Sequence, residues 1–288
     1  MSDVMAAGPR AAGSLQRQVT RLSAEGTERA GDAVSIEEPL EIRLSFSDGQ
    51  VRREQSVAVT MRTPGDDESL ATGFLAGEAI IGNPADIRRL EHSGPPSLDK
   101  GLRNVLRVEL EDWVRVDLEK LKRHFYTSSS CGVCGKASLA AIAHEAPPRE
   151  RSGFSVSASK LRQLPAALRE RQCEFTRTGG LHAAANFDAK GRIRRLHEDV
   201  GRHNALDKLV GSCFREGGLS GFGVLLSGRA SFELIQKAAM AGVGLVAAIG
   251  APSSLAIELA EQEGITLVGF LKSSGFNLYC HEQRVLEA

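Results

Sequence analysis

The sequence predicts an α/β protein in which a layered α/β domain follows a smaller α+β part. Two observations carry this prediction. Between residues 199 and 271, segments with helical periodicity alternate with short apolar segments across short connections, a pattern typical of a layered α/β domain. Residues 40–61 instead hold two stretches of alternating apolar residues around a Ser-Asp-Gly turn, which indicates a hairpin at the start of a separate part.

The α+β part is expected to span residues 37–120. Its hairpin at 40–61 leads to Pro64-Gly65, which break the strand, and Asp66 or Asp67 can cap the helix that continues to Ile80. A second hairpin is expected at 105–118, with Glu111-Asp112 as its turn. Residues 1–36 lack hydrophobic periodicity and are rich in Ala, Gly, Ser and Arg, so they predict a disordered leader.

The α/β domain is expected to span residues 121–288. It opens with a short strand at 154–157 and an amphipathic helix at 159–171 that Pro165 interrupts, followed by a hairpin at 183–196 with a Lys-Gly turn. The remaining expected helices are 199–215, 232–240 and 254–263, and the remaining strands are 224–226, 245–249 and 266–271.

The composition limits the classes of protein to consider. The 288 residues include 36 Lys and Arg against 36 Asp and Glu, a balance that argues against a nucleic-acid binder, since such proteins carry a basic excess. The longest apolar stretch of low charge, 242–252, is shorter than the roughly 20 residues that span a bilayer. The first residues contain no apolar segment of a signal peptide. We therefore expect a cytoplasmic protein with neither a membrane nor a nucleic acid as partner.

One Cys-x-x-Cys pair, Cys131 and Cys134, stands out among the five cysteines. Its neighbours are small and polar, and apolar residues resume at 139–142, so the pair is expected in a mobile, accessible loop at a helix start. The helix dipole and Lys136 would favour a thiolate there, which suits a persulfide that the second thiol can release. Redox chemistry, a metal site and a purely structural pair are the alternatives that the residues leave open.

A zinc site lacks support in the sequence. A structural zinc site needs a second closely spaced pair of ligands, whereas the other three cysteines are isolated, and His197 and His203 lie six residues apart. None of the seven histidines is followed two residues later by Glu, as the zinc deaminases require. We therefore expect no metal ion held by the protein itself.

Two further segments carry polar side chains suited to an anionic ligand. The first comprises residues 178–182 and 198–208. Here Arg202 and Lys208 could meet phosphate, and His182 and His203 could orient a ligand or a thiol. The alternative for this segment is a solvated helix capped by Asp199. In the second, Ser227, Gly228 and Arg229 lie between a strand and a helix, where phosphates collect. Neither a Gly-x-Gly-x-x-Gly nor a P-loop pattern is present.

Several motifs together resemble the formate dehydrogenase accessory sulfurtransferase family, FdhD. They occur in family order and cover the chain from about residue 37 to its end. They are Met61-Arg62-Thr63-Pro64-Gly65-Asp66-Asp67-Glu68, Ser129-Ser130-Cys131-Gly132-Val133-Cys134-Gly135, Thr178-Gly179-Gly180-Leu181-His182, Glu198-Asp199-Val200-Gly201-Arg202-His203-Asn204-Ala205, Ser227-Gly228-Arg229, and the ending 267–279.

The resemblance implies a sulfur carrier for molybdenum-cofactor maturation. Such proteins take sulfur from a cysteine desulfurase as a persulfide and pass it to the bis-molybdopterin guanine dinucleotide cofactor of formate dehydrogenase. Their larger domain is cytidine-deaminase-like. The persulfide maps to Cys131, with Cys134 as its partner. A cofactor-binding stretch maps to Phe270, Leu271, Lys272, Ser273, Ser274 and Gly275, with Lys272 where many relatives have Arg.

From this resemblance and the residues we expect a passage lined by His182, Arg202 and His203, with the Cys131 loop at one mouth and the cofactor, held through its GDP-like portion, at the other. A cofactor-binding chaperone that passes no sulfur is the first alternative. A thiol-disulfide oxidoreductase is the second, although no Trp-Cys-x-x-Cys is present. The client enzyme and the oligomeric state, a homodimer included, stay open.

Overall fold

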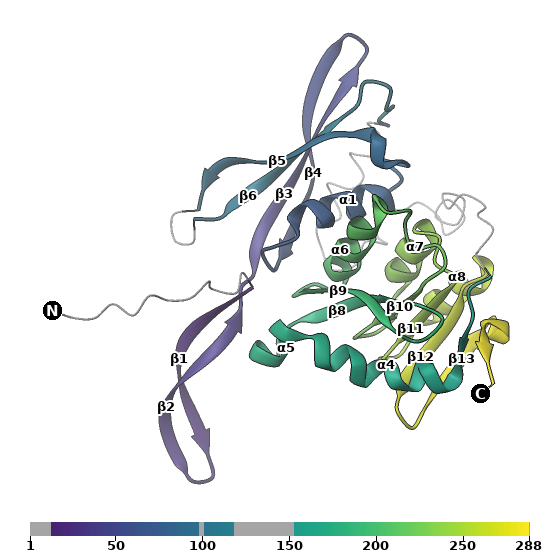
Figure 1. The fold of residues 1–288 in the computed structure, drawn as a ribbon. Helices are drawn as coiled ribbons and strands as arrows, with labels where there is room; N and C mark the ends of the chain where they lie inside the picture. The colour runs from purple at the N-terminus through teal and green to yellow at the C-terminus, as the bar shows by residue number, and fades with distance from the viewer. Residues whose placement is uncertain (1–12, 98–100, 118–152, 288) are drawn as a thin grey trace.

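The computed structural model describes residues 13–97, 101–117 and 153–287, and shows two larger β-sheets with helices between and around them, together with two two-stranded sheets (Figure 1). The larger sheet belongs to the C-terminal domain, and its strand order is β13-β12-β11-β10-β8-β9. Strands β10, β11 and β12 are parallel, whereas β8, β9 and β13 each run antiparallel to a neighbour. These strands are β8 His182–Phe187, β9 Ile193–Asp199, β10 Gly223–Leu226, β11 Leu245–Ala248, β12 Thr266–Lys272 and β13 Gly275–Cys280.

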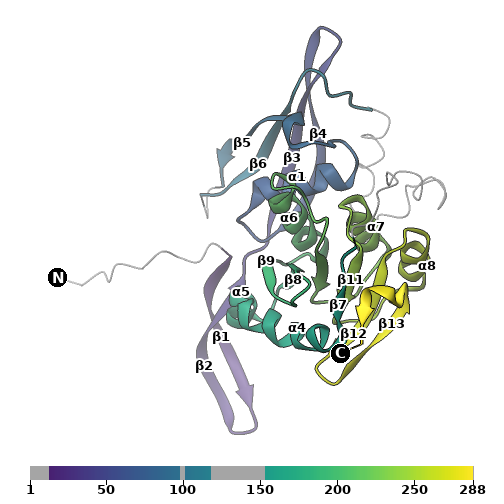
Figure 2. The same ribbon diagram turned by 45° about the vertical axis from the view of Figure 1, so that its right-hand side comes forward.

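Helices cover both faces of this sheet (Figure 2). Helix α4 lies on one face with α5 at its end, and α6, α7 and α8 lie on the other. Side chains alternate along β10: Val224 and Leu226 face the α6–α8 core, whereas Leu225 faces the core under α4. Covered on both faces, the central strands read as continuous apolar runs. The helices are α4 Ala158–Arg171, α5 Cys173–Thr178, α6 Arg202–Phe214, α7 Phe232–Met240 and α8 Ser254–Gln262.

The helices and strands expected from residue 154 onward are present in the expected order, with small shifts of the ends, and α5, β13 and β14 are additional to them. One expectation fails, because Pro165 does not interrupt α4, which runs unbroken from Ala158 to Arg171. The short strand β7 Val156–Ser157 pairs with β14 Val285–Leu286 near the C-terminus. A 3-10 turn, η3 Glu282–Arg284, precedes β14.

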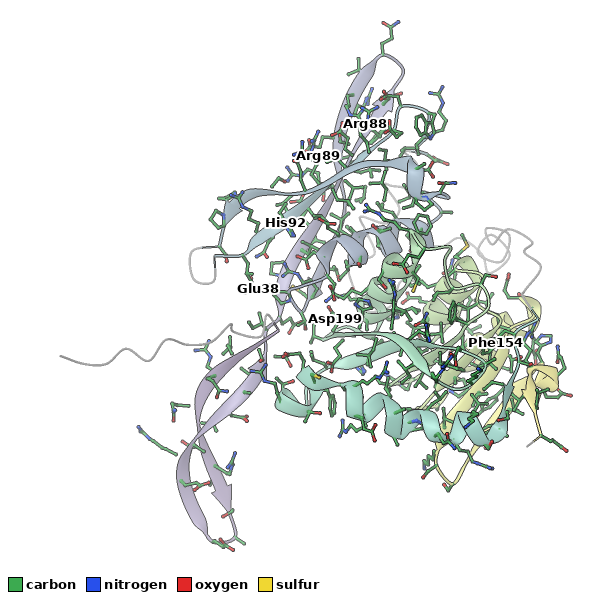
Figure 3. All side chains as sticks on the ribbon, viewed as in Figure 1. Glu38, Arg88, Arg89, His92, Phe154 and Asp199 are labelled. Atoms are coloured by element: carbon green, nitrogen blue, oxygen red, sulfur yellow. The ribbon has the colours of Figure 1, made fainter. Side chains whose placement is uncertain are left out.

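The smaller part is a four-stranded sheet of order β4-β3-β6-β5 with helix α1 packed on one face. Leu40, Ile42 and Leu44 of β3 alternate into this core and are fully buried. The other face carries interleaved Arg and Glu side chains, among them Arg88 (Figure 3), which pairs with Glu111 at 2.7 Å. The elements are β3 Glu38–Asp48, β4 Val51–Arg62, α1 Asp67–Gly77, η1 Pro84–Asp86, β5 Ile87–Pro96 and β6 Arg103–Leu110.

The hairpin expected at 105–118 is wrong. Strand β6 instead lies between β3 and β5. It runs parallel to β3, with Leu106 opposite Ile42, and antiparallel to β5, with Val108 opposite Leu90. Residues 111–117 form no strand. The apolar alternation of β6 is that of a central strand, and its partner β5 is a polar edge strand that carries no such alternation and ends in prolines, as edge strands tolerate.

The disordered leader expected for residues 1–36 is also wrong over Ser14–Ser35. This segment forms a hairpin of β1 Ser14–Ser23 and β2 Gly26–Ser35 that projects from the body (Figure 1). Most side chains on both faces of this hairpin are exposed to solvent. The two strands can therefore pair without alternating apolar residues, and the sequence shows no such alternation. Its base contacts α5 through the Ser35 hydroxyl, which donates to Thr178 Oγ1 at 2.9 Å. Residues 1–12 lie outside the described part.

The two parts meet where α1 crosses α6. A Cβ atom on Gly73 would lie 1.9 Å from the carbonyl oxygen of Asp207, and one on Gly211 would lie 1.9 Å from that of Ser69. Both glycines are therefore required by the close approach of two helix backbones. The contact holds the motif that precedes α1 against the motif that precedes α6.

Neither expected cap of α1 is formed. Asp66 occupies the N-cap position but its side chain makes no capping hydrogen bond; its Oδ2 lies 3.0 Å from His197 Nδ1. Asp67 instead pairs with buried Arg62, whose Nε and one terminal nitrogen each donate at 2.9 Å. The two carboxylates therefore join α1 to β9 and β4. Ile80, expected in the helix, lies beyond its end at Gly77.

Candidate functional site

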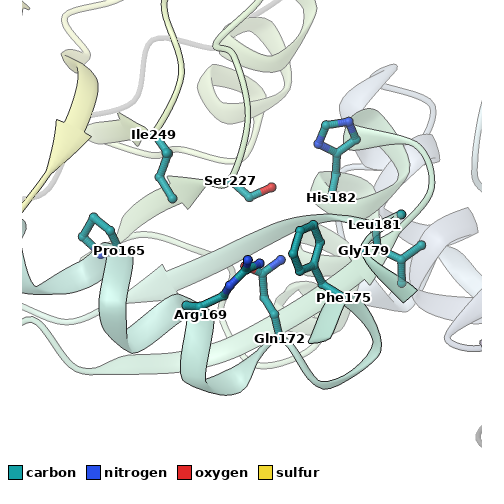
Figure 4. Close-up of a pocket in the computed structure, with 10 residues that line it drawn as sticks. Pro165, Arg169, Gln172, Phe175, Gly179, Leu181, His182, Ser227 and Ile249 are labelled. Atoms are coloured by element: carbon teal, nitrogen blue, oxygen red, sulfur yellow. The ribbon is translucent and has the colours of Figure 1, made fainter. Parts of the chain in front are cut away.

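A cavity of about 550 Å³ opens at the carboxyl ends of β10 and β11 (Figure 4). Ser227 and Ile249 follow these strands, and His182 begins the neighbouring β8. Helices α4 and α5 close the other side with Arg169, Gln172 and Phe175. This is the edge of an open α/β sheet at which ligands usually bind.

The loops that follow β10 and β11 run side by side with the last residues of β12 at this edge. The Gly250 amide donates to the Gly228 carbonyl at 2.9 Å, and the Phe270 amide donates to the Gly250 carbonyl at 3.0 Å. A Cβ atom on Gly250 would lie 2.9 Å from the Gly228 backbone, so only glycine fits here. This ladder brings two predicted segments, Ser227–Arg229 and the start of 270–275, to one edge.

Ser227 fixes the start of β8 beside the cavity. Its hydroxyl accepts from the Ala183 amide at 2.8 Å, while its own amide donates to the Ala183 carbonyl at 2.9 Å. His182, the residue before Ala183, is thereby held over Gly228. A Cβ atom on Gly228 would lie only 3.3 Å from His182 Nδ1. The predicted residues Ser227, Gly228 and His182 thus form one contiguous wall.

A cluster of positive side chains surrounds His182. Burial lowers the pKa of His182, and the charges of Arg202, His203 and Arg229 lower it further. The Nε of Arg202 is buried without a hydrogen-bond partner in the described structure, and Arg229 likewise pairs with no described carboxylate. His203 has an acidic partner, with its Nε2 2.9 Å from Glu233 Oε2. The cluster is therefore suited to an anion.

Asp199 does not act as the cap of a solvated helix. It is fully buried, and its Oδ2 accepts from the Thr63 amide at 3.1 Å and lies 2.7 Å from Lys208 Nζ. Lys208 is only 2% exposed and also donates to the Thr63 carbonyl at 2.8 Å. Lys208 is therefore not available to phosphate, which corrects that expectation, and both residues join the two parts of the molecule.

The stretch 270–275 contributes backbone and a hairpin tip to this edge. Phe270 is 44% exposed and has a positive φ of 52°. Leu271 is fully buried in the core under α4, so only its backbone can reach a ligand. Lys272 pairs with Gly275, which leaves Ser273 and Ser274 as the exposed turn between β12 and β13.

Among the residues that line the cavity, sequence reasoning missed Arg169, Gln172 and Phe175. Arg169 and Gln172 lie at the end of an amphipathic helix pattern, where polar residues ordinarily face solvent, and Phe175 lies in α5, so no signal singled them out.

Cys131 and Cys134 lie outside the described residues, so the expected mouth of the passage at the Cys131 loop stays a prediction, whereas its expected lining residues His182, Arg202 and His203 are described. In residues 13–97, 101–117 and 153–287, no group of three His, Cys, Asp or Glu side chains could hold a metal ion. No helix within those same ranges is long and apolar enough to cross a membrane.

Comparisons with known proteins agree on one family. Residues 36–286 match the model of the FdhD/NarQ family. A protein of Streptomyces coelicolor named sulfur carrier protein FdhD is 44% identical over 275 residues, covering 94% of this chain and 95% of its own. Proteins of the same name from Mycobacterium tuberculosis and Sulfurisphaera tokodaii are 43% and 39% identical, covering 94% and 88% of this chain and 98% and 92% of their own.

A solved structure shares the fold. The crystal structure of a protein from Desulfotalea psychrophila, described as a formate dehydrogenase accessory protein, superposes with a TM-score of 0.71 at 22% identity. The superposition covers 95% of this chain and all of that one. Both the smaller sheet and the layered domain are therefore features that the two chains have in common.

Proposed function

This chain belongs to the FdhD/NarQ family, and we propose that it is a sulfur carrier that makes a formate dehydrogenase active. It accepts sulfur from a cysteine desulfurase as a persulfide on Cys131. It then delivers that sulfur to the bis-molybdopterin guanine dinucleotide molybdenum cofactor, which it holds as cargo. The cytidine-deaminase-like arrangement that the family resemblance implies is part of this proposal, and the layering of helices on both faces of the larger sheet supports it.

One observation supports the cofactor half of the proposal. Arg202 and Arg229 lie around His182 at the strand-end cavity, and neither pairs with a carboxylate in the described part of the chain. Cations left unpaired beside a cavity favour an anionic ligand, and the diphosphate groups of the cofactor are such anions. The exposed Lys272 at the β12–β13 turn can add a further contact from the same edge.

The sulfur half follows from the two thiols. The Cys131 thiolate attacks the terminal sulfur of the desulfurase persulfide; a new S–S bond forms at Cys131 and the desulfurase thiolate leaves. The Cys134 thiolate then attacks the inner sulfur, so that the terminal sulfur departs as sulfide toward the cofactor. The two cysteines are oxidised to a disulfide in this step, and a dithiol reductant restores them.

The test is activity in a strain that lacks its own carrier protein. Complementation with the natural chain should restore formate dehydrogenase activity, whereas the Cys131→Ala chain should not. Cys173→Ala, which removes an exposed free thiol, serves as the control and should restore activity in full. Activity retained by Cys131→Ala would favour a chaperone that binds the cofactor without passing sulfur.

A further inference from the structure

We propose that the sulfur donor, a cysteine desulfurase, docks on a second cavity, which is apolar, lies at the amino-terminal edge of the larger sheet and has Trp113 beside it. This cavity and Trp113 together are called the docking face. The identity of the partner rests on the proposed function, whereas the surface itself follows from contacts of the described residues. The partner is expected to place an apolar side chain in the cavity, with basic side chains around it.

The docking face lies where three helices end. Helices α1, α6 and α7 pack side by side (Figures 1 and 2), and they end at Gly77, Phe214 and Met240. The turns at these ends enclose a cavity of about 520 Å³, whose apolar lining includes Ala76, Ile81, Pro84, Phe214, Leu219 and Met240. Phe214 and Met240 are only half-buried, so the cavity presents apolar surface to a partner.

This cavity and the strand-end cavity lie at opposite edges of the larger sheet. Helix α6 ends nine residues before β10 begins, and α7 ends five residues before β11 begins. The docking face therefore lies at the amino-terminal ends of β10 and β11, whereas Ser227 and Ile249 of the strand-end cavity follow their carboxyl ends. A protein bound at the docking face leaves the strand-end cavity open, so donor and cofactor can occupy the carrier together.

An exposed tryptophan stands beside the cavity. Trp113 is 63% exposed, and its indole nitrogen donates to Asp86 Oδ1 at 3.4 Å. The other carboxylate oxygen of Asp86 accepts from the amides of Gly82 and Asn83, each at 2.9 Å, and Gly82 lines the cavity. The indole ring is thus tied to the cavity wall while most of its surface faces solvent. A tryptophan held next to an apolar pocket is typical of the centre of a protein–protein interface.

The helix ends favour a partner that is basic around its apolar anchor. The C-terminus of a helix carries a partial negative charge, and neither α1 nor α6 has a basic side chain in its last turn. Lys237 in the last turn of α7 is engaged by Asp207, whose Oδ1 lies 2.7 Å from its Nζ. Exposed Arg215, which lines the cavity after α6, offsets part of the negative charge. The remainder disfavours an acidic anchor and favours Lys or Arg beside an apolar one.

The docking face also lies within reach of the thiol that the donor must meet. The described residues break off at Asp117, four residues after Trp113. Cys131 lies fourteen residues beyond Asp117, and a chain of that length spans at most about 50 Å. A desulfurase held at the docking face therefore keeps its own persulfide within the range that Cys131 can reach.

The test is the affinity of the full chain for a purified cysteine desulfurase, measured by biolayer interferometry. Trp113→Ala removes the exposed ring. Ala241→Arg fills the cavity, which Ala241 lines, with a side chain whose charge suits the end of α7. Each variant should weaken binding by about tenfold or more. The matched controls are Leu22→Ala, which removes another exposed apolar side chain, and Ala24→Arg in the β1–β2 turn; both should bind as the natural chain does.

Sulfur loading of Cys131 separates docking from a structural effect. With desulfurase and cysteine as the source, Trp113→Ala and Ala241→Arg should load about tenfold or more slowly at limiting desulfurase. With glutathione persulfide, a small donor that needs no docking, both should load at the rate of the natural chain. Slower loading from both sources in both variants would mean that the substitutions act on the fold or on the thiol, and would overturn the inference.

Two further measurements can refute the docking face. Both variants should melt at the temperature of the natural chain; if one melts lower, the other decides, and unchanged desulfurase affinity in a variant that melts normally overturns the inference. Saturating GDP should leave the desulfurase affinity unchanged, because the two cavities lie at opposite edges. Competition by GDP would place the desulfurase at the strand-end cavity instead.

The outcomes also separate other occupants and the two proposals. If the variants alter the oligomeric state in sedimentation and leave desulfurase affinity unchanged, the surface is a contact between copies of this chain and the inference fails. If Cys131 gains sulfur from no donor while desulfurase binding depends on Trp113 and Ala241, the proposed function fails and the docking face stands. If the variants load from desulfurase as fast as the natural chain, the docking face fails alone.

Discussion

Asp199 and Lys208 form a fully buried ion pair, with 2.7 Å between Oδ2 and Nζ, at the junction of the two sheets. Figure 3 places Asp199 between α1 and the edge of the larger sheet. The pair also binds Thr63, through its amide at 3.1 Å and its carbonyl at 2.8 Å. The acidic residue of one sequence motif thereby fixes the backbone of another.

Removing one member of this pair should destabilise the protein strongly. Lys208→Met leaves a buried carboxylate without its cation, and we expect it to lower the free energy of unfolding by about 3–5 kcal/mol. The double variant with Asp199→Asn should lose less than the sum of the two single variants, because they share one interaction. Urea denaturation measures all three. Arg192→Met, which breaks an exposed pair with Asp188, should cost at most about 1 kcal/mol.

The crossing of α1 and α6 should not tolerate a methyl group. Gly73→Ala places a Cβ atom 1.9 Å from the Asp207 carbonyl, so the helices must separate, and we expect a loss of about 1–3 kcal/mol or more in unfolding free energy. Gly77→Ala in the same helix meets nothing closer than 3.5 Å. It should leave stability unchanged or raise it by up to about 1 kcal/mol. Equal thermal stability of the two variants would contradict the packing described.

The pKa of His182 should report occupancy of the positive cluster. Burial and three positive neighbours hold it below the ordinary value of 6.5, so an NMR titration should find His182 neutral throughout the range above that value. Because the pKa is lowered on folding, the neutral ring contributes stability that is present above 6.5 and is lost as the pH falls through the folded-state pKa.

A bound anion should reverse part of this shift. Saturation with pyrophosphate offsets the charges of Arg202 and Arg229, so the titration midpoint of His182 should rise and binding should take up protons at pH values near that midpoint. Isothermal titration in buffers of different ionisation enthalpy counts those protons. A midpoint that does not move would place the anion away from His182.

Arg202 should matter for the nucleotide and not for the sulfur. Arg202→Ala removes a cation whose Nε is buried without a partner among the described residues, and we expect GDP binding to weaken by about 10-fold or more. Loading of Cys131 with sulfur should be unchanged. Arg192→Ala, exposed at the β8–β9 turn, is the control for lost charge. Simultaneous loss of GDP binding and sulfur loading would indicate a folding defect.

The larger domain could be predicted from the sequence because its apolar segments are short and bounded by Gly and Ser. The helix expected at 232–240 has the same bounds as α7, which begins at Phe232 and ends at Met240. The β1–β2 hairpin could not be predicted, since strands exposed on both faces need no apolar alternation. The partner predicted for strand β6 is wrong, because its true neighbour β5 is a polar edge strand whose sequence carries no alternation of apolar residues.

The part of the candidate site that could be predicted from the sequence consists of residues that come directly after a strand. Ser227, Gly228 and Arg229 follow a buried strand, and the topology of parallel strands brings such ends together. The prediction that Lys208 meets phosphate is wrong, because the sequence pattern does not reveal that this lysine in the middle of α6 is turned inward to a buried carboxylate. Gln172 was missed for the opposite reason, since only the tertiary structure shows that this polar residue is buried against a cavity.

The central claim is that Cys131 carries the sulfur, and intact-mass measurement tests it most directly. The natural chain is incubated with a cysteine desulfurase and cysteine, then compared with the Cys131→Ala and Cys134→Ala chains treated in the same way. We expect the mass of one added sulfur atom on the natural chain and on Cys134→Ala, and none on Cys131→Ala. A sulfur adduct of equal yield on Cys131→Ala, or no adduct on any of the three chains, would contradict the account.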